Sequence, residues 1–429
     1  MPLSDLADRL PGSWLARLWL ALGLLYLAGA VLHPLLLTHG AALLVLLALP
    51  QAGGQWRRLP PEVRAVLLGF VLYVAAALPS LFNTQDWHGA GWRFERYHPF
   101  LLILPVVLAL HRQRRLAVPL LVGGVCLGGL ALGAFAAWRQ LATGWPRIGW
   151  VSALHPNMFG GVAFLFALLN GLAAALLARG RATRAALLAG ALAAGYAGFA
   201  SGSRGALLAG LAAAAWSAVV LARRHPAGWR RLRGPLLAGA ALLAAALLAS
   251  AHWRGRLLQG ALELHDFLLG EHQPDNTSER LMMWWAGLRI WAAHPLLGTG
   301  LGDTLRDFAA LRADPGFDYF GRLYAIFHNI YIDALASTGL LGFGAMLAGV
   351  FVLPLRCFLR RLRRPDPVAR WTGLAGSALL VYLAVLGLLH SWLYLRPVPL
   401  LLFVLALLLA GGAIPDNGGP DQPPSARRP

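Results

Sequence analysis

The sequence contains no lysine, so arginine supplies all 37 of its basic side chains. Charged residues of both signs make up only 13% of the 429 residues, and the acidic ones number 18. Apolar residues account for 58%, which is more than one aqueous core can bury in a chain of this length. The composition therefore excludes an ordinary soluble domain and indicates that lipid surrounds most of the chain.

Three further absences narrow the class of protein. The two cysteines, Cys126 and Cys357, fall inside one apolar run and at the cytoplasmic end of another, so no disulfide is expected. No small-residue cleavage site follows the apolar stretch that begins at Leu15, so we expect a first transmembrane helix and not a signal peptide. No acidic cluster in the one long loop has the spacing of metal ligands, which predicts a site without metal.

Long apolar runs recur from one end of the sequence to the other. A helix needs roughly 17 to 25 mostly apolar residues to cross the hydrocarbon core of a membrane. Runs that meet or approach this length lie at residues 15–32, 34–49, 63–81, 99–110, 116–138, 158–177, 185–200, 205–222, 235–250, 327–355, 371–389 and 397–409. They predict an all-α, polytopic membrane bundle of about 12 transmembrane helices, in which the short run 99–110 is the weakest member.

The arginines give an independent prediction of topology, because loops that stay in the cytoplasm carry an excess of positive residues. With this number of helices, every second loop is basic, and these loops and the chain ends hold most of the 37 basic residues. The basic loops lie near residues 57–64, 112–115, 179–184, 223–233 and 356–370. We therefore expect both termini in the cytoplasm, and we attribute the net charge of +19 to topology beside anionic membrane lipids, with no nucleic-acid partner.

One connection breaks the pattern of short loops. The predicted organisation is nine transmembrane helices in residues 1–250, a large periplasmic loop in 251–326, three transmembrane helices in 327–412 and a disordered cytoplasmic tail in 413–429.

Helical spacing and capping residues predict three helices inside that loop. The first is amphipathic, near 257–268, and is expected on the membrane surface; the second runs from Asn276, its expected cap, to about His294, and the third begins at Asp303. The glycines of 298–302 follow a helix and not a strand, so they predict a tight turn and not a nucleotide-binding motif.

Two arginines fall where the topology would not place them. Arg204 begins a transmembrane helix at its outer end, and Arg280 lies in the first turn of a loop helix. Helix N-termini already carry partial positive charge, so an arginine there is unfavourable unless an anion is shared. A guanidinium suits a phosphate because its planar fork donates two parallel hydrogen bonds, whereas the alternatives are a headgroup anchor or a salt bridge to Glu279 or Asp303. Weaker candidates for the same anion site are Arg139, Arg147 and Arg289.

His328 stands at the outer start of a long apolar run, directly before Asn329. With an ordinary pKa near about 6.5, its imidazole can accept a proton at neutral pH, and nearby arginines would help to keep it neutral. It is a candidate general base for a hydroxyl, with an ordinary interfacial hydrogen bond as the alternative. Asp333, one turn further on, either orients the His328 ring or makes a buried polar contact elsewhere.

Several short motifs occur in a fixed order around the long loop. Ser-Arg-Gly at 203–205 begins one helix, an arginine-bearing helix leads to the glycine turn at 298–302, and His-Asn at 328–329 precedes Thr-Gly-Leu-Leu-Gly at 338–342. His-Pro-Asn-Met at 155–158 lies just before another apolar run. In the order and placement of these motifs, the chain resembles the O-antigen ligase and O-antigen polymerase superfamily.

The resemblance implies a GT-C-type glycosyltransferase of the bacterial inner membrane, with its active site at the periplasmic face. Its donor would be a glycan on undecaprenyl diphosphate and its acceptor a sugar hydroxyl of lipid A–core, without metal or cofactor. By the same analogy, His328 is the base, and Arg204 and Arg280 bind the diphosphate. Residues expected to support them are Ser203, Asn157, Asn329, Asp333 and Gly300. Because no carboxylate nucleophile is apparent, a single displacement that inverts the anomeric centre is expected.

Three other functions stay open. An O-antigen polymerase would use a second lipid-linked glycan as acceptor, and a bactoprenol-dependent protein glycosyltransferase would use a Ser, Thr or Tyr side chain. The single long loop late in the chain favours the ligase over the polymerase. A transporter or flippase is the alternative from another class. A transporter tends to have a repeat of hydropathy between its halves and charged residues at mid-membrane depth. This sequence shows no such repeat and has few charges at that depth.

Overall fold

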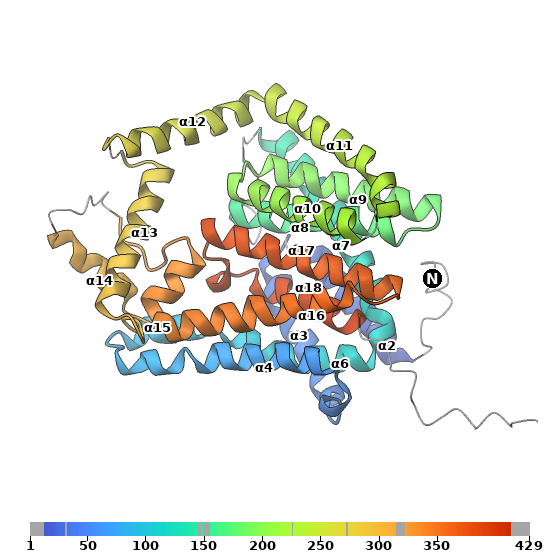
Figure 1. The fold of residues 1–429 in the computed structure, drawn as a ribbon, viewed down its shortest axis with the longest axis horizontal. Helices are drawn as coiled ribbons and strands as arrows, with labels where there is room; N and C mark the ends of the chain where they lie inside the picture. The colour runs from blue at the N-terminus through green and yellow to red at the C-terminus, as the bar shows by residue number, and fades with distance from the viewer. Residues whose placement is uncertain are drawn as a thin grey trace, which may run out of the picture.

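The computed structural model describes residues 13–30, 32–144, 147–148, 155–224, 226–271, 273–314 and 322–412. Throughout these residues the secondary structure is helical, with no strand. Most helices run roughly along one common direction (Figure 1). The predicted tail at 413–429 lies outside the described residues.

Each predicted apolar run overlaps a helix of the structure. The helices of the bundle are α2 (Trp14–Gly29), α3 (Pro34–Ala52), α4 (Pro61–Ala75), α6 (His98–Arg112), α7 (Arg114–Thr143), α8 (Pro156–Leu176), α9 (Arg181–Ala200), α10 (Arg204–Arg224), α11 (Pro226–Ala249), α15 (Ile330–Met346), α16 (Leu353–Arg361), α17 (Pro367–Leu389) and α18 (Val398–Gly411). A short π-helical stretch, Leu347–Val352, joins α15 to α16.

Within the described residues, seven helical runs are long and apolar enough to cross a membrane. They are Pro34–Ala52, Pro61–Phe82, Arg114–Thr143, Pro156–Leu176, Arg204–Arg224, Ile330–Arg361 and Pro367–Leu389. By contrast, α2, α6 and α18 have 16, 15 and 14 residues, which at about 1.5 Å per residue reach only roughly 21–24 Å. The hydrocarbon core is about 30 Å thick. The chain is therefore a polytopic helical membrane protein, and the full number of crossings stays a prediction.

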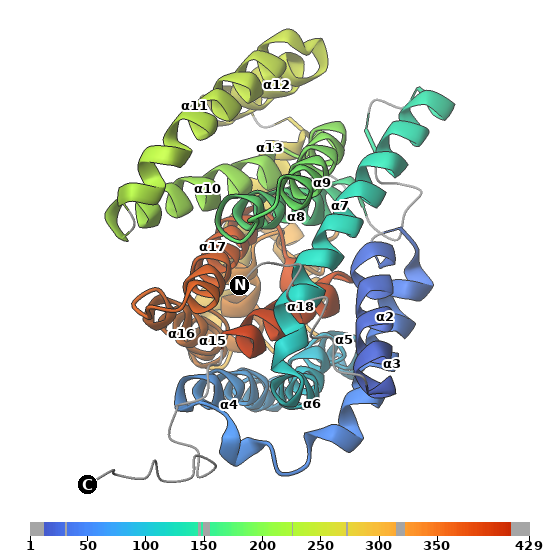
Figure 2. The ribbon, with the colours of Figure 1, turned by 90° about the vertical axis from the view of Figure 1, so that its right-hand side faces the viewer.

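Helices α7, α8 and α9 lie close together (Figure 2), and small residues let their backbones approach. A Cβ atom added to Gly129 of α7 would stand 2.5 Å from the carbonyl oxygen of Gly190 of α9. Asn170 of α8 is fully buried, and its side chain donates a hydrogen bond to the Val125 carbonyl at 2.8 Å. Close backbone packing and hydrogen bonds from polar side chains to neighbouring helices hold helices together in lipid, where no hydrophobic effect drives them to associate.

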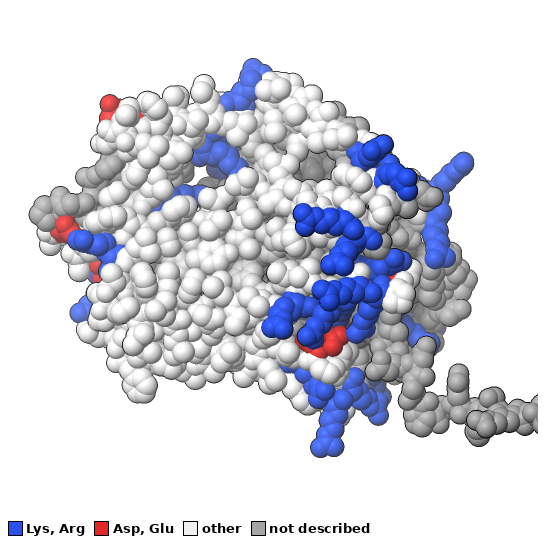
Figure 3. All heavy atoms as spheres, in the orientation of Figure 1, with Lys and Arg blue, Asp and Glu red and all other residues white. Residues whose placement is uncertain are grey.

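Helix ends that carry arginine lie together at one end of the bundle, called here the basic end. Arg361, at the end of α16, is buried and donates hydrogen bonds of 2.6 and 2.7 Å to the carbonyls of Leu408 and Leu409, in the last turn of α18. Arg364 pairs with Glu62, at the start of α4, at 2.9 Å. Figure 3 shows basic side chains gathered toward this end of the visible face. The assignment of this end to the cytoplasm stays a prediction.

The long loop folds into three helices, α12 (Ala251–Leu268), α13 (Asn276–Ala293) and α14 (Thr304–Ala310), with α13 and α14 at the end opposite the basic one (Figure 1). The expected cap of α13 is wrong by one residue, because Asp275 accepts hydrogen bonds from the amides of Thr277 and Ser278, each at 2.8 Å. The two helices α11 and α12 lie along the outside of the bundle, and α13 leads back from them to α15 (Figures 1 and 2).

The glycine turn after α13 docks the loop onto the bundle. Gly298 and Gly300 have φ angles of 73° and 120°, which the predicted tight turn requires. A Cβ atom on Gly298 would stand 2.4 Å from the backbone of α15. At the same place Gly339, with a φ of 62°, breaks the helical geometry of α15. The turn therefore sits in the kink of α15 and fixes α13 beside that helix.

Candidate functional site

His328 lies in the turn that leads into α15, and its backbone is left-handed. Its φ of 52° makes it the one non-glycine residue with a positive φ among those that the structure describes. Such a conformation costs of order 1–3 kcal/mol and persists only where the surroundings enforce it. The next residue, Asn329, caps α15 by accepting hydrogen bonds from the amides of Tyr331 and Ile332 at 3.0 and 3.3 Å. The strained residue is thus followed at once by a fixed helix start.

Asp333 is the buried carboxylate beneath this turn. Its Oδ1 accepts a hydrogen bond from the Phe327 amide at 2.8 Å, and its Oδ2 accepts one from the hydroxyl of Ser391. Both oxygens are therefore engaged away from the His328 ring. Asp333 makes the buried contact that was the second of its two expected roles, and it ties the turn before α15 to the segment that follows α17.

Next to Ser391 in that segment, His390 is buried against His328. The two ring centroids are 5.4 Å apart, and the ring planes meet edge to face at 74°. Both ring nitrogens of His390 and Nδ1 of His328 are buried without a hydrogen-bond partner among the described residues. Buried polar atoms in native proteins nearly always have such a partner. The two imidazoles therefore mark a place where a polar ligand group would be stabilised.

Arg204 is the first residue of α10, and the hydroxyl of Ser203 caps that helix by accepting an amide hydrogen bond at 3.3 Å. The Arg204 side chain reaches α12, where it donates to the carbonyl of Arg256 at 2.9 Å and to the carboxylate of Glu263 at 3.5 Å. A Cβ atom on Gly260 would stand 1.9 Å from the Arg204 guanidinium, so a larger residue there would displace that guanidinium. The packing of α10 against α12 therefore fixes this arginine.

Arg280 approaches the same place from α13. On this helix, Met283 and Ile290 belong to a buried apolar cluster with Phe327, the residue before His328. Gly287 lets α13 come close, since a Cβ atom there would stand 2.3 Å from the side chain of Ile332. Arg280 is half-buried, and its guanidinium forms no hydrogen bond or salt bridge with any described residue. It is thus a half-buried cation held near the candidate base without a partner among the described residues.

Arg147 joins the group from the segment before α8. Its Nε donates to the Ser201 carbonyl at 3.2 Å, and its guanidinium donates to the side-chain oxygen of Asn157 at 3.0 Å. His155 caps α8 by accepting a hydrogen bond from the Asn157 amide at 3.3 Å. The His-Pro-Asn motif therefore positions an arginine, a role that the sequence left unspecified.

Arg147, Arg204, Arg256 and Arg280 form one cluster, called here the arginine cluster. Burial lowers the pKa of Arg280, and the positive charges of Arg204 and Arg256 lower it further. Burial lowers the pKa of Arg147 to about 10, and the charges of the other three arginines contribute. A guanidinium with a pKa near 10 is still charged at neutral pH, so the like charges persist with Glu263 as the carboxylate beside them. Such a group attracts an anion.

The same electrostatic field acts on the histidines. Burial lowers the pKa of His328 to about 4, and the positive charges of Arg280 and His155 contribute to the shift. Burial is also the main reason why the pKa values of His155 and His252 are lowered, followed by the charges of nearby arginines. His328 is therefore neutral at neutral pH and holds a lone pair that can accept a proton.

A groove of about 290 Å³, called here the arginine groove, opens beside the cluster between α10, α12 and α13. Its polar wall is formed by Arg204, Thr277 and Arg280. Its apolar wall is formed by Leu208, Leu257, Leu281, Trp284 and Leu389. Figure 3 shows basic side chains inside a hollow of the surface below α12. Guanidinium groups beside aliphatic side chains fit a ligand with an anionic head and an apolar tail.

Two expected donor ligands lie in other surroundings. Arg289 forms a salt bridge with Asp314, and its guanidinium lies 4.8 Å from the ring centroid of Trp285. The guanidinium of Arg139 lies 5.4 Å from the ring centroid of Trp138. The expected supporting residue Gly300 belongs to the docking turn after α13, where a Cβ atom would stand 2.6 Å from the Asp303 carboxylate. Arg289, Arg139 and Gly300 therefore lie outside the group of arginines described above.

The salt bridges considered for Arg204 and Arg280 are wrong, because Arg204 pairs with Glu263 and Arg280 forms no salt bridge with a described residue. Glu279 pairs with Arg322 at 3.5 Å, and Asp303 accepts hydrogen bonds from the backbone amides of residues 85 and 86, each at 2.9 Å. Both carboxylates are thus occupied by the folding of the loop onto the bundle.

Sequence reasoning missed three residues of this site: Arg256, His252 and His390. The expectation that α12 lies on the membrane surface gives Arg256 and His252 no role, yet Nε of Arg256 and Nε2 of His252 are buried without a hydrogen-bond partner within the described residues. A signal for His390 does exist in the sequence, because it ends a predicted span on the same side as His328. Only tertiary packing brings the two rings into contact.

Residues 188–347 match the family model described as O-Antigen ligase. Over these residues, which are 160 of the 429, the chain is similar to the O-antigen ligase family. The resemblance noted in the sequence is thereby confirmed at the level of the family. The family region contains Arg204, Arg256, Arg280 and His328, whereas Arg147 and His390 lie outside it. No curated protein matches the chain. In the described part of the chain, no group of three or more His, Cys, Asp or Glu side chains is arranged to hold a metal ion.

Proposed function

We propose that the protein is an O-antigen ligase of the GT-C type, which transfers a glycan from undecaprenyl diphosphate to a sugar hydroxyl of lipid A–core at the periplasmic face of the inner membrane. The observation that carries the proposal is a cluster of four arginines near a neutral histidine, two of which, Arg204 and Arg280, line an amphipathic groove. The family region supports the class of reaction, and both termini would lie in the cytoplasm.

The diphosphate would lie on the arginine cluster. Arg280 has no partner in the described chain, and Nε of Arg256 is buried without one, so both have donors to offer an anion. Arg204 and Arg147 are held by Glu263 and Asn157, and they contribute charge from fixed positions. As the glycosyl bond breaks, negative charge grows on the departing diphosphate, and preorganised cations stabilise that charge most in the transition state. The apolar wall of the groove would take the first part of the polyprenyl chain.

His328 would be the general base. The oxygen of the acceptor hydroxyl attacks the anomeric carbon, its proton passes to the imidazole, and the electron pair of the broken bond leaves with the diphosphate. One displacement on the face opposite the leaving group inverts the anomeric centre. Because the charge of Arg280 helps to lower the pKa of His328, a diphosphate bound at Arg280 would offset that charge and raise the pKa. Donor binding would then make His328 a stronger base at neutral pH.

The test is transfer of glycan to purified lipid A–core by the detergent-solubilised chain in EDTA, with His328→Asn as the main variant. Asparagine tolerates the left-handed backbone at this position, so the turn should fold while the base is lost. We expect the rate to fall roughly 10²- to 10⁴-fold. The matched control is His265→Asn, which changes an exposed histidine of α12 and should leave the rate unchanged.

Three outcomes would change the assignment. Full activity of His328→Asn would exclude His328 as the base. Glycan chains that lengthen on the lipid carrier, without transfer to lipid A–core, would identify a polymerase. Activity that EDTA abolishes and Mg²⁺ restores would contradict a metal-independent reaction.

A further inference from the structure

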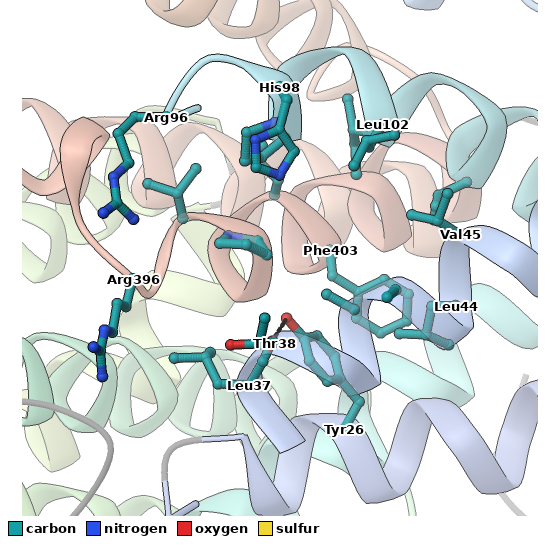
Figure 4. Close-up of a pocket in the computed structure, with 18 of the residues that line it drawn as sticks. Tyr26, Leu37, Thr38, Leu44, Val45, Arg96, His98, Leu102, Arg396 and Phe403 are labelled. Carbon is teal, nitrogen blue, oxygen red and sulfur yellow. Dashed lines mark hydrogen bonds between the residues drawn. The ribbon is translucent and has the colours of Figure 1, made fainter. Parts of the chain in front are cut away.

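A second pocket lies between α3, α6 and α18, on the side of the bundle away from α12 (Figure 2). Its volume is about 270 Å³. In Figure 4, Arg96 and Arg396 stand at one end of this pocket, and Leu44, Val45 and Phe403 stand at the other. The pocket, called here the α3–α6–α18 pocket, is therefore amphipathic, like the arginine groove, and nothing in the proposed donor site uses it.

The polar end of this pocket is positively charged. Arg96 and Arg396 line it together with His98 and Glu95. Within the chain as described, neither guanidinium forms a salt bridge, and Nε of Arg96 is buried without a hydrogen-bond partner while its guanidinium lies 4.9 Å from the Trp92 ring. The two guanidinium groups outnumber the single carboxylate at this end of the pocket, so the end has a net positive charge. A phosphate is the group that their hydrogen-bond geometry fits.

The other end is apolar and reaches the outer surface of the bundle. Phe403 and Leu44 are buried at its base, whereas Leu102 at its edge is 41% exposed. Just beyond the pocket, α3 presents exposed leucines such as Leu46, and α3 is one of the helices able to span a membrane. Pockets that enclose a whole drug-sized ligand measure about 300–1,000 Å³. A pocket slightly smaller than this, open toward the lipid, suits one acyl chain of a larger lipid.

The segment 390–396 connects this pocket to the candidate active site. His390 packs on His328 at its first position, and Arg396 lines the pocket at its last. Six residues span at most about 20 Å even when fully extended, and the segment contains the 3₁₀ turn Trp392–Tyr394. Arg93 of α5 (Trp87–Phe94) braces the segment, since its guanidinium lies 5.2 Å from the Tyr394 ring. The pocket and His328 are thus held at a fixed, short separation.

We propose that the α3–α6–α18 pocket seats the lipid anchor of the acceptor, with a lipid phosphate on Arg96 and Arg396 and one acyl chain between the helices. The claim that a phosphorylated lipid binds here rests on the pocket alone. The claim that this lipid belongs to the acceptor rests on the proposed glycan transfer. Two lipid-anchored substrates cannot share one groove. Donor and acceptor would therefore approach His328 from opposite sides of the bundle, each from its own lipid-facing opening.

Binding is tested first, by a route that does not need the transfer reaction. The full chain in nanodiscs is exposed to phosphatidic acid that carries a photoreactive acyl chain, and crosslinked peptides are identified. We expect crosslinks in α3, α6 or α18, reduced about tenfold in Arg96→Gln/Arg396→Gln, as expected when two charge-assisted contacts are lost. The matched control, Arg179→Gln/Arg181→Gln, removes two exposed arginines from the basic end and should change nothing. Equal labelling by the same probe with a phosphocholine head would overturn the phosphate assignment.

Kinetics then test whether the bound lipid is the acceptor. In Arg96→Gln/Arg396→Gln we expect the KM for lipid A–core to rise about tenfold or more, with kcat and the donor KM unchanged, because only anchoring is weakened. Ala41→Phe, which fills the pocket without removing charge, should raise the same KM if the double variant does not fold. Lost crosslinks with an unchanged acceptor KM would overturn the proposal in favour of a structural phospholipid. No transfer by the wild type would overturn the proposed function, while the crosslinks would still decide whether the pocket binds a phosphorylated lipid.

Discussion

Arg361 and Arg364 at the basic end have different surroundings from Arg280 in the arginine cluster. At the basic end, Arg361 is bound to two backbone carbonyls and Arg364 to a carboxylate. In the cluster, Arg280 lies beside other guanidinium groups and has no partner among the described residues. The residue type is the same in the two places, so it does not reveal the difference in role. The comparison teaches that an arginine bound to several carbonyls or to a carboxylate supports the fold, whereas one that, like Arg280, makes no such contact indicates a site for an anion.

Among the arginine variants, Arg280→Ala should have the largest effect on activity. This change removes the cation nearest to both the groove and His328, and the loss of one preorganised electrostatic group typically costs about 10²- to 10³-fold in rate. Thermal stability should stay the same or increase, because a repulsive charge has been removed. The rate is measured by glycan transfer and the stability by the Tm in detergent.

Its matched control lies on the same helix. Arg289→Ala breaks a salt bridge with Asp314 outside the cluster, so the transfer rate should stay within a few-fold of the wild type. Equal losses in the two variants would erase the distinction between partnered and unpartnered arginines.

Arg361→Met should show the reverse behaviour. The change leaves the carbonyls of Leu408 and Leu409 without their donor in a buried place, and hydrogen bonds that involve a charged group contribute about 1.5–3 kcal/mol each. We expect the free energy of unfolding to fall by about 3 kcal/mol, with little change in kcat for the protein that remains folded. Arg363→Met, at an exposed neighbour, is the control for denaturation measured in detergent. An unchanged Tm would show that Arg361 is not the structural residue described here.

Gly260→Ala tests whether the geometry of the cluster matters as well as its charge. The new methyl group would collide with the Arg204 guanidinium, which would have to move away from Glu263. A displacement of about 1 Å in a catalytic group can reduce rates up to 10²-fold, and we expect roughly a tenfold loss of transfer. Gly255→Ala, on the same helix but with open space around its Cβ position, should have full activity. Equal activity of both variants would mean that Arg204 tolerates relocation.

The pH dependence of the rate should reveal the link between Arg280 and His328. In the free enzyme the pKa of His328 is about 4, so kcat/KM should hold as the pH falls and decline only near that value, where the imidazole becomes protonated. In the substrate complex the diphosphate offsets the charge of Arg280, so the acid limb of kcat should lie higher, by about one unit. Arg280→Gln should likewise shift the acid limb of kcat/KM to a higher pH.

Activity recovered after return to neutral pH controls for unfolding in this experiment. Coincident limbs for kcat and kcat/KM would contradict an electrostatic link between the arginine cluster and the base.

Local sequence signals account for most of the helices and for the central residues of the site. Apolar runs and caps depend on neighbours along the chain, which is why the three loop helices could be placed before the structure was known. Arg204, Arg280 and His328 were recognisable because each begins or precedes a helix on the expected outer side. The structure brings the three together, through the contact of α10 with α12 and of α13 with the turn before α15.

What the sequence could not predict depends on contacts between distant segments. Arg289 has the same residue type and the same helix as Arg280, and only the position of Asp314 separates their surroundings. Asp333 is one turn from His328, yet its partner is Ser391, in the segment after α17. His390 joins the site by the same tertiary route. The local sequence thus identifies candidate site residues, and contacts between distant segments determine which of them form the site.

The left-handed backbone at residue 328 limits which residues can replace the histidine. Asparagine, aspartate and glycine enter this conformation at low cost, whereas β-branched residues do not. Asparagine or glycine at this position would remove the proton acceptor and leave the arginine cluster and both lipid-facing openings intact. Such a protein would hold the two substrates together without releasing product, and would make a stalled ternary complex accessible to structure determination.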